Sequence, residues 1–302
     1  MTIQVYCQNS KNRRLIVFIL LVLANVVLAV IFKFFDKYGV NNLNAIVVNY
    51  FVCVITASLF LGDFSIPAQF YLKPWFGCSV ILSLLFIFGF NLMALSFQKA
   101  GVALTAIIQK MSLIISAGFA IIFYNEALNT IKIFGFLAAL LTIVLVNYPD
   151  RGGIKLKSKW VIMLPLIVFA LSGIIEVLLY YVEVTGLVVE DGLYFTSTSF
   201  GLAGVWGALY IGYALRTNKT QFVVKDILGG LVLGFPNFFS IYLIVYLLSS
   251  GWDGSILFPL NNVSILVLTT MTGAFLFKER VSIFKMIGLV FGIIAIILIS
   301  SS

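Results

Sequence analysis

Two charged side chains fall well inside long apolar stretches of this chain. Lys110 interrupts the stretch from Val102 to Tyr124, and Glu176 interrupts the stretch 160–182. An ionisable group near the middle of a bilayer costs roughly 3 kcal/mol on insertion scales, so it usually faces a partner or a watery cavity. A lysine there can hold an anionic or carbonyl-bearing group, and a carboxylate can hold a proton or a cationic group. Lys110 and Glu176 are therefore our first candidates for a binding site.

Polar uncharged side chains accompany both ions. On a helix of 3.6 residues per turn, Gln109 lies on a polar stripe with Thr105, Ser112 and Ser116, and Lys110 lies about 100° away beside it. Tyr180 follows Glu176 by one turn on the same face. Amides in other apolar stretches extend the set. The candidate substrate-binding residues are Lys110, Gln109, Glu176, Tyr180, Asn25, Asn91, Asn261 and Asn262.

Several purely structural interpretations compete with a binding site. Lys110 and Glu176 can form a structural ion pair, although their positions along the predicted helices put them about 12 Å apart in depth. A lysine can also extend its head group toward the membrane surface. Amide side chains often join helices without touching a ligand. The sequence alone leaves these alternatives open.

The composition indicates a protein embedded in the lipid bilayer. Of its 302 residues, 62% are hydrophobic and only 10% are charged, against about a quarter charged in soluble domains. The net charge of +8 is spread in small groups between apolar runs, as in membrane loops. We therefore expect a multi-pass protein of the cell (inner) membrane and no nucleic-acid partner.

Several kinds of chemistry have no matching residues. The chain has no histidine, which removes the commonest general base and metal ligand. Cys7, Cys53 and Cys78 show neither a disulfide framework nor metal-ligand spacing. We predict no catalytic residues, no metal site and no cofactor, and hence a protein that is not an enzyme.

Apolar segments long enough to cross a membrane recur along the whole chain. A crossing helix needs about 20 residues, and ten segments qualify, which predicts an all-α integral membrane fold with ten transmembrane helices. They cover roughly 15–32, 43–61, 75–97, 102–124, 130–148, 160–182, 192–215, 226–249, 255–277 and 281–300. A polar linker at 149–159 separates five spans in 1–148 from five in 160–302.

The two groups of five spans share a pattern at a constant offset of 153 residues. The matched pairs are Glu126 with Glu279, Lys132 with Lys285, Gly135 with Gly288, Ala139 with Gly292, and Gln109 with Asn262. Because five is odd, the second repeat is inverted in the membrane, as in many secondary transporters. Small residues four apart predict close helix packing. Glu126 lies at a span end, where we expect a structural contact with a loop lysine or a helix N-terminus.

The repeated pattern and the run FNLMALSFQKAGVALTAII at 90–108 resemble the drug/metabolite transporter superfamily, in particular its ten-span EamA-like members. The resemblance covers nearly the whole chain. The run LANVVLAVIFKFF at 23–35 is similar to the first span of small multidrug-resistance relatives, in which the position of Asn25 is a proton-coupling carboxylate. Glu176, close to the repeat offset from Asn25, is the candidate to replace that carboxylate.

The resemblance implies a secondary transporter that moves a small metabolite, such as an amino acid or a similar polar or amphipathic compound, out of the cell by alternating access. Protons are a candidate coupling ion, and the protein is expected as a monomer or homodimer. A sugar-phosphate or nucleotide-sugar exchanger is the alternative within transport, and a non-transporting membrane scaffold is the alternative from another class. The family implies cytoplasmic termini, whereas the lysine and arginine excess after odd-numbered spans favours external ones.

Overall fold

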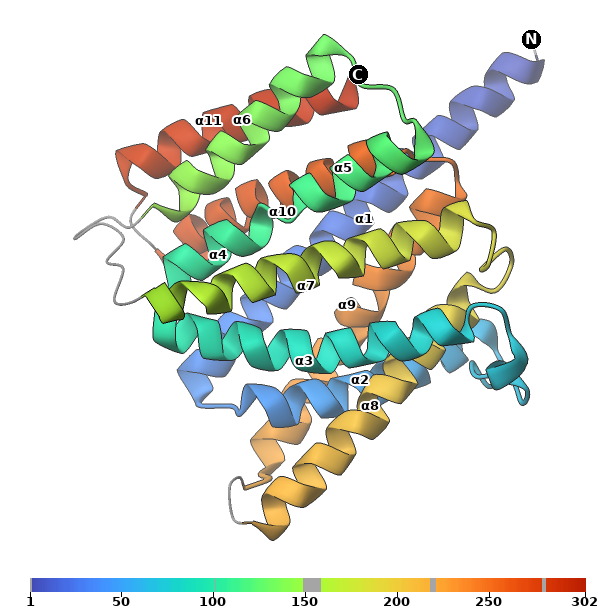
Figure 1. Cartoon of the computed structure of the whole chain (residues 1–302), viewed down its shortest axis with the longest axis vertical. Helices are drawn as coiled ribbons and strands as arrows, with labels where there is room; N and C mark the ends of the chain where they lie inside the picture. The colour runs from blue at the N-terminus through green and yellow to red at the C-terminus, as the bar shows by residue number, and fades with distance from the viewer. Residues whose placement is uncertain (1, 101, 149–158, 218–220, 279–280) are drawn as a thin grey trace. The chain divides into compact units, whose positions relative to one another are not determined.

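The protein is all-α in its described residues, which in this computed structural model are 2–100, 102–148, 159–217, 221–278 and 281–302. Within them, ten candidate spans are long and apolar enough to cross a membrane, which confirms the predicted fold class. The helices (Figure 1) are α1 (Thr2–Tyr38), α2 (Asn42–Leu61), α3 (Phe76–Ala100), α4 (Val102–Lys110), α5 (Leu113–Tyr124), α6 (Thr130–Asn147), α7 (Lys159–Val184), α8 (Gly192–Arg216), α9 (Val224–Ser249), α10 (Gly254–Phe277) and α11 (Ile283–Ser300). Linker residues 149–158 and Glu279 lie outside the described residues.

The fourth span differs from the continuous helix expected over 102–124. It consists of α4 and α5, separated by a turn at Met111 and Ser112. Hydrophobic periodicity does not reveal such a break, because the residues on both sides, apart from Gln109 and Lys110, remain apolar or small. The break follows directly after Lys110, so it bears on the candidate site.

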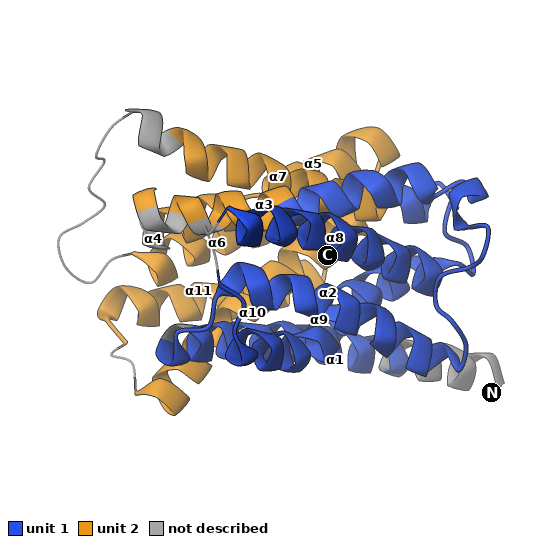
Figure 2. Cartoon of the chain, turned by 90° about the horizontal axis from the view of Figure 1, so that it is seen from below, with its two compact units in different colours: residues 1–87, 181–251 blue, residues 88–180, 252–302 orange. Residues whose placement is uncertain are grey.

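The helices cluster into two compact units, coloured separately in Figure 2. Unit 1 contains residues 1–87 and 181–251, and unit 2 contains residues 88–180 and 252–302. Each unit therefore draws helices from both halves of the sequence. The division into two units reports only how the helices pack. It does not test the predicted domain boundary at the linker or the inverted repeat, so both stay predictions.

In unit 1, α2 packs against α9 through glycines of α9. A Cβ at Gly230 would lie 2.6 Å from the Ala45 carbonyl oxygen, and one at Gly234 would lie 2.4 Å from Val52. These distances are too short for any larger residue, so the glycines permit the close approach of the two helices. At one end of this pair, the buried Asp226 accepts hydrogen bonds from the Asn41 N–H (2.9 Å) and Asn44 Nδ2 (2.8 Å).

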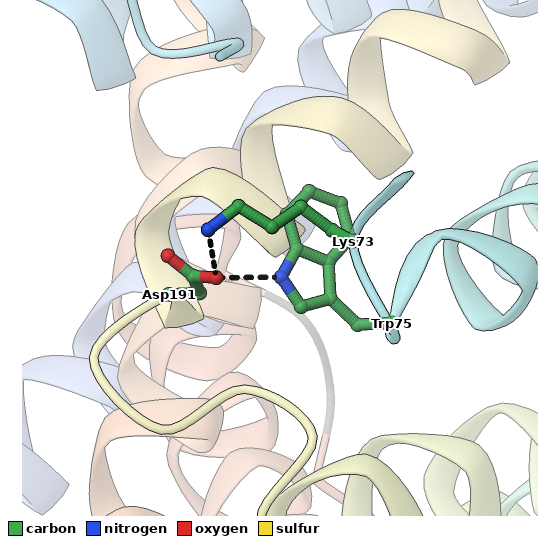
Figure 3. Close-up of polar contacts among 3 residues, drawn as sticks. All are labelled: Lys73, Trp75 and Asp191. Carbon is green, nitrogen blue, oxygen red and sulfur yellow. Dashed lines mark hydrogen bonds and ion pairs between the residues drawn. The ribbon is translucent and has the colours of Figure 1, made fainter. Parts of the chain in front are cut away.

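A second carboxylate in unit 1 joins two connectors (Figure 3). Asp191, just before α8, accepts a hydrogen bond from Lys73 Nζ at 2.9 Å and one from Trp75 Nε1 at 3.0 Å. The Trp75 ring is fully buried and packs edge-on against Phe195. Partial burial opposes ionisation of Asp191, but the two hydrogen bonds outweigh it and hold the pKa of this carboxyl below its ordinary value.

In unit 2, α6 and α11 lie side by side (Figure 1). A Cβ at Gly135 would lie 2.7 Å from Ile299, and a Cβ at Gly288 would lie 2.8 Å from Val146. Gly135 and Gly288 are matched by the 153-residue offset, and so are Val146 and Ile299. The two contacts are therefore reciprocal, as a pseudo-two-fold relation between α6 and α11 requires.

Candidate functional site

The break between α4 and α5 places Lys110 at the end of a helix inside a membrane span. The Ser112 N–H bonds the Gln109 carbonyl at 3.0 Å, three residues back, instead of the Ile108 carbonyl four residues back. Irregular backbone at membrane depth is tolerated only within protein or beside water. The negative end of the α4 dipole also favours a cation at this position. The break thus leaves the half-buried Lys110 at the carbonyl end of α4.

Lys110 and Glu176 are joined through one amide side chain. Lys110 Nζ donates to Asn262 Oδ1 at 3.1 Å, and Asn262 Nδ2 donates to Glu176 Oε1 at 2.9 Å. Asn262 is only 5% exposed. The two charges fix the orientation of this amide, because its oxygen faces the cation and its nitrogen faces the anion. The geometry is neither the direct ion pair nor the lysine directed toward the membrane surface, since Asn262 accepts from Lys110 and donates to Glu176.

Close helix packing in unit 2 brings these three residues together. Asn262 lies on α10, which packs against α5. Gly173 lies one turn before Glu176 on α7, and a Cβ there would lie 2.6 Å from Ile115 on α5. The missing side chain lets α7 approach the broken span closely enough for Glu176 to reach Asn262.

Two buried oxygens, one on Glu176 and one on the residue before Asn262, form no hydrogen bond among the described residues, although the Ser116 hydroxyl lies beside the Glu176 carboxylate. They are Glu176 Oε2 and Asn261 Oδ1. A buried acceptor without a partner costs about 1–3 kcal/mol, and more when it is charged. A ligand that brings hydrogen-bond donors, or a proton on the carboxylate, would remove that cost. We name Lys110, Asn262, Glu176 and Asn261 the amide-bridged cluster.

The remaining predicted residues occupy different surroundings. Gln109 is half-buried in the last turn of α4, and Asn91 is half-buried on α3 in unit 2. Asn25 lies on α1 in unit 1, where its Nδ2 donates to the Leu21 carbonyl at 2.9 Å. Tyr180 donates its hydroxyl to Glu126 Oε1 at 2.5 Å. Tyr180 therefore follows Glu176 along α7, as its spacing predicts, but bonds a different carboxylate.

Glu126 forms a second carboxylate centre in unit 2, which we call the Glu126 anchor. Besides the Tyr180 hydroxyl, it accepts hydrogen bonds from the backbone N–H groups of Gly254 (2.8 Å) and Ser255 (2.9 Å). These are the first residues of α10, whose free N–H groups and positive dipole end favour an anion. The contact with a helix N-terminus agrees with the structural role expected from the sequence.

Lys132 completes the anchor, although sequence reasoning did not assign it a partner. Its Nζ donates to the Ala127 carbonyl at 2.7 Å and to Ser255 Oγ at 3.0 Å, and the side chain is only 2% exposed. Asp253 precedes α10 beside this group. Burial raises the pKa of Asp253, the Glu126 charge adds to that rise, and Lys132 partly offsets it. Glu126 and Lys132 are six residues apart, as are Glu279 and Lys285 in the second repeat. This repeated spacing was the one sequence signal that linked Glu126 with Lys132.

Three comparisons place the chain among known proteins. A model described as the EamA-like transporter family matches residues 16–148. An uncharacterized protein of Haemophilus influenzae is 30% identical over 285 residues, covering 91% of this chain and 94% of that protein. A solved crystal structure of a protein is similar with a TM-score of 0.75 at 15% identity, covering 95% of this chain and 96% of its own. At that identity the last match supports the fold alone.

The helices, the repeated pattern and these similarities lead to one conclusion. The spans make the protein a multi-pass membrane protein, and the match over the first five spans is to a family of transporters rather than enzymes. The chain belongs to the EamA-like transporter family, as its resemblance to the drug/metabolite transporter superfamily implied.

Proposed function

We propose that this protein is a secondary transporter that exports a small metabolite, an amino acid or a similar polar or amphipathic compound, by alternating access. The observation that carries the proposal is the amide-bridged cluster. Lys110 and Glu176 are held two hydrogen bonds apart by Asn262, and Glu176 Oε2 forms no hydrogen bond among the described residues. The cluster therefore combines a cation, an anion and unused acceptor capacity inside membrane spans.

The chemistry of the cluster suits a compound with groups of both polarities. An anionic or carbonyl group would accept from Lys110, and an ammonium or hydroxyl group would donate to Glu176 Oε2. Asn261 Oδ1 offers a further acceptor. Because charges interact strongly away from bulk water, the same carboxylate would bind either a proton or the substrate's cationic group. Competition of this kind couples proton movement to export.

The test is transport in proteoliposomes that contain the purified protein, with a panel of radiolabelled amino acids and related compounds. Lys110→Ala and Glu176→Gln are each expected to lower transport about 30-fold or more, because truncating one partner of a buried charged contact costs at least about 2 kcal/mol. Lys99→Ala and Glu190→Gln serve as controls, since both side chains are exposed. Unchanged rate and affinity in both cluster variants would refute this assignment of the site.

A further inference from the structure

Three helices of unit 2 that carry or continue the candidate site meet at the Glu126 carboxylate. Glu126 lies two residues past the end of α5, where its N–H bonds the Ala120 carbonyl at 3.4 Å. Its oxygens bond Tyr180 of α7 and the first residues of α10. The C-terminal end of the broken span, α7 and α10 are therefore fastened together at a single side chain.

The same helices hold the amide-bridged cluster at a short distance along their axes. Tyr180 lies four residues after Glu176, or about 6 Å along α7. Asn262 lies eight residues after Gly254, or about 12 Å along α10. A shift of α7 or α10 at the anchor would consequently move Glu176 or Asn262, because a helix transmits displacement along its length.

We propose that Glu126 is a positioning residue that latches α5, α7 and α10 on the side of connectors 125–129 and 250–253, and that its release opens the candidate site to that side. The proposal rests on the proposed function, because the latched state would be the state of an alternating-access cycle that is closed on the connector side. Glu126 aligns Glu176 and Asn262 through their helices and does not touch the substrate.

The contacts of Glu126 suit a reversible latch. Among the described residues, its three donors are hydroxyl or backbone N–H groups rather than a lysine or arginine. Water that enters from the connector side can replace each of them, whereas a lysine or arginine partner would be left as an unpaired buried charge when the helices part. The N-terminal end of α10, capped by Glu126 in this structure, can therefore be capped by water when the helices part.

The experiment measures access to the site and requires no substrate. Cys7, Cys53 and Cys78 are replaced by serine. Ser116→Cys is introduced on α5, where Ser116 is only 1% exposed and lies beside the Glu176 carboxylate of the site. A membrane-impermeant maleimide is then applied from each side of oriented vesicles. Glu126→Gln and Tyr180→Phe are expected to accelerate labelling from the connector side by roughly tenfold, the effect of losing a charge-assisted hydrogen bond from the closed state, and to leave labelling from the other side unchanged.

The matched control is Asp226→Asn, which weakens a comparable buried cap in unit 1 and should not change labelling of Ser116→Cys. In a double-mutant cycle, Glu126→Gln and Tyr180→Phe should be non-additive, because both break one contact. Equal acceleration from both sides, or the same effect in Asp226→Asn, would mean general loosening and would overturn the latch. Labelling as predicted together with wild-type transport in Lys110→Ala and Glu176→Gln would refute the site while retaining the latch.

Discussion

Glu126 and Glu176 are carboxylates in the same unit of this protein, yet their hydrogen bonding differs. Glu126 uses both oxygens, which accept from two N–H groups of α10 and from Tyr180. Glu176 uses one oxygen to accept from Asn262, and the other is buried and forms no hydrogen bond among the described residues. A carboxylate saturated by backbone and tyrosine donors stabilises helix positions. One with an unused oxygen retains the capacity to bind a proton or a ligand.

The largest expected effect tests the structural half of this comparison. Glu126→Ala removes the acceptor of two backbone N–H groups and one hydroxyl, and unpaired buried polar groups cost about 1–3 kcal/mol each. We expect the free energy of unfolding in detergent to fall by about 3 kcal/mol, measured by thermal unfolding followed by circular dichroism. Glu190→Ala, in an exposed connector, should leave it unchanged. A fall no larger than that of the control would remove the distinction between the two carboxylates.

The next effect tests the functional half. Glu176→Gln keeps an acceptor for Asn262 and a similar volume but removes the charge. We expect substrate affinity to fall about 30-fold, equivalent to about 2 kcal/mol, while the free energy of unfolding changes by less than about 1 kcal/mol. Binding by isothermal titration and thermal unfolding on the same preparation measure both. A loss of stability with unchanged affinity would make Glu176 a second anchor.

A smaller effect separates Tyr180 from Glu176. If Tyr180 belongs to the Glu126 anchor, Tyr180→Phe removes one hydrogen bond and keeps the ring, so unfolding should become easier by about 1 kcal/mol. Substrate affinity should fall by less than in Glu176→Gln, because Tyr180 affects the site only through the position of α7. A loss of affinity as large as that in Glu176→Gln, measured by the same titration, would return Tyr180 to the binding site.

The smallest effect comes from Asp191, a carboxylate outside the spans that serves as a reference for the other two. Its folded-state pKa is lowered, so its ion pair with Lys73 contributes stability above the unfolded pKa of about 4. That contribution is lost as the pH falls through the lowered folded pKa. For a partly exposed pair we expect at most about 1 kcal/mol. We would follow thermal unfolding of wild type and Asp191→Asn from neutral pH downward in steps of about one unit around the ordinary aspartate pKa. The difference between them should narrow as the pH falls, and a constant difference would contradict this role.

The fold was predictable from sequence because the bilayer imposes a strong constraint. A crossing segment must bury all its backbone hydrogen bonds and needs about 20 apolar residues, so the ten spans are visible in the composition. The pairing of α6 with α11 was indicated by glycines at a constant offset, such as Gly135 and Gly288. The break after Lys110 was not, since only the spacing of the backbone hydrogen bonds changes there, from four residues to three, while most of the neighbouring residues remain apolar or small.

The sequence by itself determined that this is a ten-span membrane protein of a transporter family, and that Lys110, Glu176 and Asn262 are unusual residues for their surroundings. Only the tertiary structure decided how they are connected. Asn262 lies between the two charges, and Tyr180 bonds Glu126 although its spacing matches Glu176. Periodicity defines the face of one helix, but hydrogen-bond partners depend on the distance and rotation between helices. Those are set by close approaches such as that of Gly173 to Ile115.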